Sequence, residues 1–153
     1  MLKKLVVGAL ICVAIGLSEG NSASAAGNGD GNIVVESNVS WTVSWENCNQ
    51  LPAGITVTGT GTFVDIFLKS GGDEAQGLGS ATDNLGNTYK WHYASHFTAH
   101  NSGFIDHFNL SGNGPAAYVT GFQAVFTEAG VEPVWVHGDP LGFPNGGARC
   151  DPL

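Results

Sequence analysis

The feature that most constrains how this chain can fold is a long alternation of apolar and polar residues, NIVVESNVSWTVSWE at 32–46. Apolar side chains hold most of the odd positions, among them Val39, Trp41 and Val43, whereas serine, threonine, asparagine and glutamate hold most of the even ones. Successive side chains of a β-strand point to opposite faces of a sheet. A period of two over this length therefore predicts one long strand with a single buried face.

The same period of two recurs along the rest of the chain. It predicts strands at 88–99, 104–111 and 117–127, a short strand at 133–137, and either one strand kinked at glycines or two strands within 55–72. A turn is expected at 83–87 (DNLGN), since asparagine and glycine readily adopt the backbone angles that turns need. No segment after residue 26 has a sustained helical period. About six to eight antiparallel strands predict an all-β chain with a single β-sandwich or jelly-roll-like domain.

The first 26 residues have the features of a cleavable signal peptide. Lys3 and Lys4 give a positive start, residues 5–17 form an apolar run, and SASAA at 22–26 supplies small residues for cleavage after Ala25 or Ala26. The apolar run is shorter than the about 20 residues of a transmembrane helix, so we expect no transmembrane anchor in the mature chain. The sequence predicts a secreted or periplasmic protein with one domain at 27–153 that ends in a Gly/Pro-rich tail.

Two cysteines remain after the signal peptide, because Cys12 lies inside it. Two cysteines in an exported protein usually pair, so we expect a disulfide between Cys48 and Cys150. Their positions lack the C-x-x-C spacing of a redox or metal-binding pair. The expected bond would tie the C-terminal tail to the loop after the first long strand.

The predicted mature chain is strongly acidic. Its basic residues are Lys69, Lys90 and Arg149, against twelve aspartates and glutamates. Nucleic acids and anionic membranes bind basic patches, so this balance argues against nucleic acid and against an anionic membrane surface. A surface protein, a glycan or self-association are the partners that remain to be considered.

Three of the five histidines are spaced four apart, at His92, His96 and His100. On a helix this spacing would gather them on one face. The residues around them alternate as in a strand, however, and four residues of strand span about 13 Å. Metal–nitrogen bonds are only about 2.0–2.1 Å long, so neighbouring histidines of this strand are not expected to share one metal ion.

A metal site between two strands is the remaining possibility. A hairpin with a two-residue turn at 101–102 or 102–103 would set His107 opposite His96 or diagonal to it, with His100 near the turn. His96, His107 and His100 are therefore the predicted metal ligands, and neutral imidazoles suit Zn, Cu or Ni. The alternative is a polar strand face that uses histidine without a metal.

Two aspartates lie among apolar neighbours, Asp65 in FVDIF and Asp106 in FIDHF. Burial would raise the pKa of such carboxyl groups, as it does in general acids. The alternative is that each carboxylate accepts hydrogen bonds near a strand end.

Aromatic residues could provide a platform for sugar rings. Six of them fall on the apolar side of the alternation and are expected in the core: Trp41, Trp45, Tyr89, Trp91, Tyr93 and Phe97. Trp135 and Phe143, near the irregular end of the chain, are better candidates for exposed aromatic side chains.

The sequence contains no G-x-S-x-G elbow, no H-E-x-x-H pair, no phosphate-binding glycine loop and no EF-hand. It therefore favours an exported, non-catalytic β-sandwich protein, either a binding module or a structural component of the cell surface or extracellular space. The alternative is a periplasmic or extracellular transition-metal-binding protein that uses surface histidines. A small hydrolase that uses Asp65, Asp106 or His107 is the third hypothesis.

Overall fold

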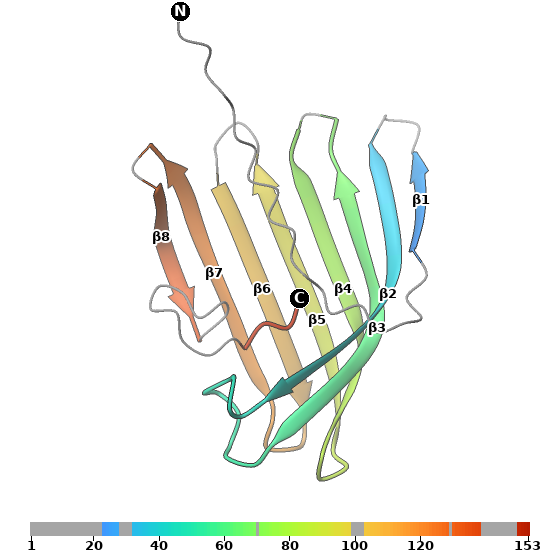
Figure 1. Cartoon of the computed structure of the whole chain (residues 1–153), viewed down its shortest axis with the longest axis vertical. Coiled ribbons are helices and arrows are strands. Elements are labelled where there is room, and N and C mark those ends of the chain that lie inside the picture. The colour runs from blue at the N-terminus through green and yellow to red at the C-terminus, as the bar shows by residue number, and fades with distance from the viewer. Residues whose placement is uncertain (1–22, 28–31, 70, 99–102, 129, 139–149) are drawn as a thin grey trace, which may run out of the picture.

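The computed structural model of this chain is all-β and consists of one open antiparallel sheet (Figure 1). It describes residues 23–27, 32–69, 71–98, 103–128, 130–138 and 150–153. The strands are β1 (Ala23–Gly27), β2 (Ile33–Ser44), β3 (Thr56–Phe67), β4 (Asp73–Asp83), β5 (Thr88–Thr98), β6 (Gly103–Gly112), β7 (Tyr118–Thr127) and β8 (Gly130–His137). They lie in the sheet in chain order, so every strand pairs with its neighbours in the sequence. The predicted all-β class with antiparallel strands is confirmed.

The alternation in the sequence separates the side chains onto two faces of the sheet. On β2 the side chains of Val39, Trp41 and Val43 are buried, while Thr42 between them is exposed. We call the buried side the inner face and the opposite side the outer face. The register pairs inner residues with inner residues across the strands, as with Trp41 and Gly59 or Tyr93 and Phe108. One face therefore forms the core and the other is left to solvent.

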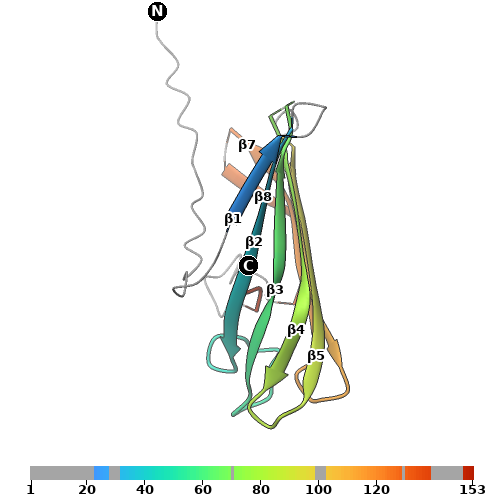
Figure 2. The ribbon, with the colours of Figure 1, turned by 90° about the vertical axis from the view of Figure 1, so that its right-hand side faces the viewer.

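The sheet is so strongly coiled that inner-face side chains of strands far apart in the sheet contact each other. The rings of Trp41 on β2 and Phe108 on β6 have centroids 5.5 Å apart, although a flat sheet would separate β2 from β6 by about 19 Å at 4.7–4.9 Å per strand. Trp41 also meets Trp91 of β5 edge to face, with centroids 6.0 Å apart. The lower parts of β2 and β3 sweep across the sheet in the front view, and the side view shows the strands as one curved layer (Figures 1 and 2).

Glycines on β3 and β4 make room for the Trp91 indole at the centre of the core. Gly61 and Gly79 are paired across the two strands. A Cβ atom on Gly79 would collide with the carbonyl oxygen of Thr60 and with the indole of Trp91. The indole N–H donates to that same carbonyl oxygen over 3.0 Å. β4 was absent from the sequence prediction, because its inner positions are alanine and glycine and give little apolar signal.

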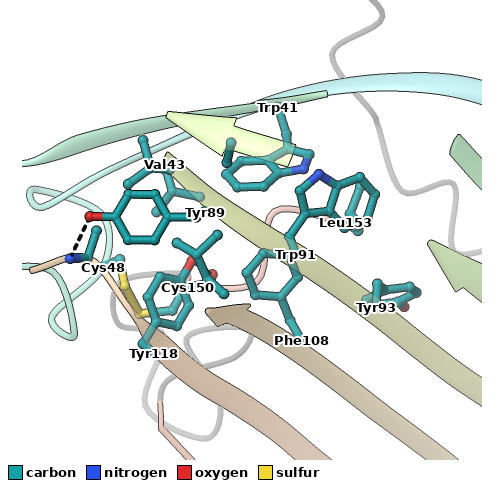
Figure 3. Close-up of a cluster of buried hydrophobic side chains, with 14 of the residues drawn as sticks. Trp41, Val43, Cys48, Tyr89, Trp91, Tyr93, Phe108, Tyr118, Cys150 and Leu153 are labelled. Carbon is teal, nitrogen blue, oxygen red and sulfur yellow. Dashed lines mark hydrogen bonds between the residues drawn. A yellow bond between two sulfur atoms is a disulfide. The ribbon is translucent and has the colours of Figure 1, made fainter. Parts of the chain in front are cut away.

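Two short irregular segments cover the side of the core that the sheet leaves open. The loop after β2 contributes Cys48, Leu51 and Ile55, and the chain end contributes Cys150 and Leu153, all buried. Cys48 and Cys150 form the predicted disulfide across a sequence separation of 102 residues (Figure 3).

Two expectations from the sequence need revision. The described strands form one sheet, so the predicted sandwich or jelly roll of two packed sheets is not confirmed; the coil of a single sheet, the loop and the chain end cover the inner face instead. Trp45, expected in the core, is 43% exposed because β2 ends one residue earlier, at Ser44. In the described part of the chain no helix is long and apolar enough to cross a membrane.

Candidate functional site

The register between β5 and β6 decides which histidines can meet. β5 ends at Thr98 and β6 begins at Gly103, so four residues link them, not the two of the predicted turns. The Gly103 backbone N–H donates to Oγ1 of Thr98 over 3.3 Å at this end of the hairpin. His107 consequently lies opposite Ala94, diagonal to both His92 and His96. Of the two predicted arrangements, His96 directly opposite His107 is wrong, because His96 faces Ile105. The diagonal placement is the one found, although the link between the strands is longer than the predicted turn.

A shallow depression on the outer face brings His92 and His107 together. It has a volume of about 240 Å³ and is lined by His92, Ala94, His107, Phe108, Asn109 and Val119. Ala94, which lies opposite His107 on β5, contributes its small side chain to the lining. His92, which the sequence suggested to be too remote, therefore shares a site with His107.

The His107 ring is held by a hydrogen bond. Its Nδ1 lies 3.3 Å from the carbonyl oxygen of Thr120. A carbonyl can only accept, so Nδ1 carries the proton and Nε2 of the neutral ring is left as an acceptor or a metal ligand. Imidazoles that bind metals commonly have their second nitrogen held in this way.

The other candidate ligands lie elsewhere. His96 is half-exposed, and its Nδ1 lies 3.3 Å from a carboxylate oxygen of Glu74 on β4. His100 lies outside the described residues. Among the residues that the structure describes, no three histidine, cysteine, aspartate or glutamate side chains gather into a group able to hold a metal ion.

Trp135 extends this part of the outer face onto β8, the edge strand of the sheet (Figure 1). The residue is 37% exposed, as the sequence suggested. Its indole N–H donates to Oε1 of Gln123 over 3.0 Å, and its ring lies 5.9 Å from the His107 ring. Gly121 lies beneath both rings, since a Cβ atom there would be 2.9 Å from Nδ1 of His107 and 3.2 Å from the indole. We call His92, His107, Asn109, Gln123 and Trp135 the outer patch.

The residues of the hydrolase hypothesis do not come together. Asp106 lies on the inner face of β6 and is 2% exposed, whereas its neighbour His107 points to the outer face. Asp65 lies in the same inner row as Asp106, but two strands separate β3 from β6. The charged group that raises the pKa of Asp65 is Asp73, not Asp106.

The environments of these aspartates explain their placement. Burial raises the pKa of Asp65, and the nearby charge of Asp73 adds to this effect. Asp106 accepts a hydrogen bond from the Tyr93 hydroxyl over 2.9 Å. Burial raises the pKa of Tyr93, and the carboxylates of Asp106 and Asp151 raise it further, so this phenol stays protonated and donates. The hydrogen bond between Tyr93 and Asp106 joins β5 to β6 inside the core.

The turn at 83–87 is explained without a ligand. Asp83 Oδ1 accepts the backbone N–H groups of Leu85 and Asn87, and Oδ2 accepts from the Asn87 amide and the Tyr89 hydroxyl, all within 2.8–2.9 Å. Burial opposes ionisation of Asp83, but these four hydrogen bonds outweigh it and hold the pKa of this carboxyl below its ordinary value. Asp83 is a structural residue.

A second depression lies next to the outer patch, across β3, β4 and β5. Its volume is about 510 Å³, and its lining includes the hydroxyl groups of Thr60, Thr62 and Ser80 and the side chain of Lys90. Lys90 and His92 are adjacent outward positions of β5, so the two depressions are neighbours. Sequence reasoning missed both, because side chains from non-adjacent segments form them and only the register shows which ones meet.

Comparison with known proteins finds no matching family model, no similar curated protein and no similar solved structure. The fold and the outer patch are therefore the basis for the function proposed below.

Proposed function

We propose that this chain is an exported, non-catalytic binding protein and that its ligand binds the outer face of β5–β8. The signal-peptide features of residues 1–26 support export. The predicted cleavage positions, Ala25 and Ala26, fall within β1, so cleavage there would leave β2 as an edge of the sheet. Partners recognised at this surface would lie at the cell surface or outside it.

The observation that carries this proposal is the seating of Trp135. A large aromatic residue on an outer face is unremarkable when it is mobile, but this one is fixed by a hydrogen bond to Gln123 and by the space over Gly121. Aromatic residues that are both exposed and rigid contribute strongly to recognition, because little side-chain entropy is lost on binding. Beside Trp135, the depression at His92 and His107 offers hydrogen-bonding groups that could set specificity.

Binding to the producing cells tests the proposal. Fluorescently labelled protein, purified after export, would be added to washed cells and their secreted matrix. We expect the parent to bind and Trp135→Ala/His107→Ala to lose at least tenfold in affinity. The control is Thr58→Ala/Thr82→Ala, which alters exposed outer residues on β3 and β4. No binding by the parent, or equal loss in both double variants, would refute the proposal.

A transition-metal-binding protein is the second candidate, and the orientation of His107 favours it. The hydrogen bond to Thr120 leaves Nε2 of His107 available, and His92 lines the same depression. The ligand pair would then be His92 and His107, with Asn109 as a third polar neighbour, and imidazole ligands suit Zn, Cu or Ni.

Calorimetry with zinc and copper distinguishes the two candidates. If the metal proposal holds, His92→Ala and His107→Ala abolish binding while His96→Ala leaves it unchanged, and acid weakens it because metal competes with protons. If the parent gives no binding heat with zinc or copper, or if all three variants lose metal binding equally, this site is excluded.

A further inference from the structure

The outer patch differs from the rest of this acidic chain in carrying no carboxylate. The whole chain has a formal net charge of −8, yet the five patch residues are two imidazoles, two amides and one indole. The nearest acidic residue on the neighbouring β4, Glu74, faces His96 instead. A charged ligand therefore finds no opposite charge among these five residues, and the exposed charges that flank them, Lys90 on β5 and Glu132 on β8, have opposite signs, which favours a neutral ligand.

The patch also combines one flat aromatic surface with several groups that both donate and accept hydrogen bonds. The amides of Asn109 and Gln123 each have donor and acceptor atoms, and Nε2 of His107 can accept. The π face of an indole is electron-rich and attracts weakly positive C–H groups. A sugar ring presents C–H groups on one face and hydroxyl groups around its edge, so it matches both parts of the patch.

The two depressions define a direction for a longer ligand. Thr60 and Ser80 lie on β3 and β4, Lys90 and His92 on β5, His107 and Asn109 on β6, and Trp135 on β8. Five strand steps from β3 to β8 cover about 24 Å at the usual strand spacing. The line through these hydroxyl, amide and imidazole groups is oblique to the strands. The register sets Trp135 level with His96, whereas Thr60 and Ser80 lie level with Lys90, further along β5.

We infer that the outer face binds a neutral glycan chain, with one pyranose ring stacked on Trp135 and the chain directed across the strands toward His92 and Lys90. This inference rests on the proposed binding function and specifies its ligand. Gln123 acts as a positioning residue, because it fixes the indole through the N–H group. His107 lies beside the indole and offers a hydrogen-bonding group to the pyranose ring that is stacked there.

Calorimetry with cellohexaose and chitohexaose tests the inference, with oligogalacturonate of the same length as a charged probe. We expect the parent to bind at least one neutral hexasaccharide and to bind the charged probe at least tenfold more weakly. Trp135→Ala should weaken the neutral complex at least tenfold, and Trp135→Phe should restore part of the loss. Trp45→Ala is the matched control: Trp45 is similarly exposed, at 43%, but lies beyond β2, and its replacement should change affinity less than twofold.

Failure of the glycan inference can be separated from failure of the proposed function. If the parent binds neither neutral hexasaccharide, or if Trp45→Ala weakens binding as much as Trp135→Ala, the glycan inference is wrong. Periodate oxidation of the cell surface then decides the rest: patch-dependent cell binding that survives oxidation keeps the binding function and excludes a periodate-sensitive glycan. For a parent that does bind a neutral hexasaccharide, cell binding should be lost after oxidation.

Discussion

Gly121 shows how one missing side chain builds the outer patch. The space over its Cα is occupied by the rings of His107 and Trp135, and a Cβ atom would lie 2.6 Å from the carbonyl oxygen of Asp106. Because that contact is with backbone, relaxation would need a shift of β6 against β7. The glycine is therefore required by close approach of the chain and not by its backbone angles.

Gly121→Ala should destabilise the fold by about 1–3 kcal/mol, the usual cost of overpacking. It should also weaken ligand binding, because the indole and the imidazole are displaced together. Denaturant unfolding measures the first effect and the cell-binding assay the second. Ser111→Ala, an exposed position on β6, is the control and should change stability by less than about 0.5 kcal/mol. Unchanged stability of Gly121→Ala would contradict the packing described here.

Asp83 gives the fold a dependence on acid. Its pKa is lower in the folded chain than in the unfolded chain, because four hydrogen bonds favour the charged form. The unfolded state then binds more protons as the pH falls, so the contribution of Asp83 is present above the unfolded value, about 3.9, and is lost below it. Asp83→Asn should lower the melting temperature at pH 7, and the difference from the parent should shrink below about pH 4.

Asp65→Asn should change the stability of the fold in the opposite direction. Burial raises the pKa of Asp65, so its charged form opposes folding at neutral pH, and the amide should stabilise the chain there but not in acid. Melting curves from pH 3 to pH 7 measure both variants. A constant difference between Asp83→Asn and the parent over this range would contradict the hydrogen-bonded role of the carboxylate.

Among the elements, the loop after β2 and the chain end depend on each other. The Cys48–Cys150 disulfide joins them, and the Tyr118 hydroxyl donates to the carbonyl oxygen of Cys150 over 2.6 Å. Burial raises the pKa of Tyr118, and the charge of Asp151 adds to this, so the hydroxyl keeps its proton. The covalent bond also keeps the two segments close together in the unfolded chain, so it should contribute strongly to their stability.

Cys48→Ser/Cys150→Ser should lower the free energy of unfolding by about 2–5 kcal/mol, as expected for the loss of a native disulfide. Hydrogen exchange should increase first at 150–153 and in the loop at 45–55. The parent, denatured without reductant, should show no reactive thiol at these two positions. Labelling of both cysteines in exported parent protein would show that the bond does not form.

The edge strand β8 also has features that limit strand-to-strand association. Every residue of β8 is exposed, including Val134 and Val136, and the pairing with β7 is irregular between Gln123 and Ala124. Pro133 has no N–H group to offer a further strand, and Glu132 adds charge. These features are typical of an edge protected against pairing, so self-association through β8 is less favoured than binding on the outer face.

Over the whole molecule, three features were predictable from the sequence: the all-β class, the alternation of buried and exposed side chains along the strands, and the disulfide. Each of them depends on a local pattern or on a single pair of residues. The register between β5 and β6 was not predictable, since the link between Thr98 and Gly103 is longer than the assumed turn. The coil that joins Trp41 to Phe108 arises from tertiary packing and leaves no local signal. Trp135 was recognised as an exposed aromatic residue, but its partners Gln123, Gly121 and His107 became evident only from the sheet.

The most direct test of the account is tryptophan oxidation footprinting of the exported protein, free and bound to material from the producing cells. In the free protein, N-bromosuccinimide should oxidise Trp45 and Trp135 first, while Trp41 and Trp91, at 6% and 2% exposure, react slowly. In the bound protein we predict that Trp135 becomes protected and Trp45 does not. Equal oxidation of Trp135 in the free and bound protein would contradict the claim that the outer patch is the binding surface.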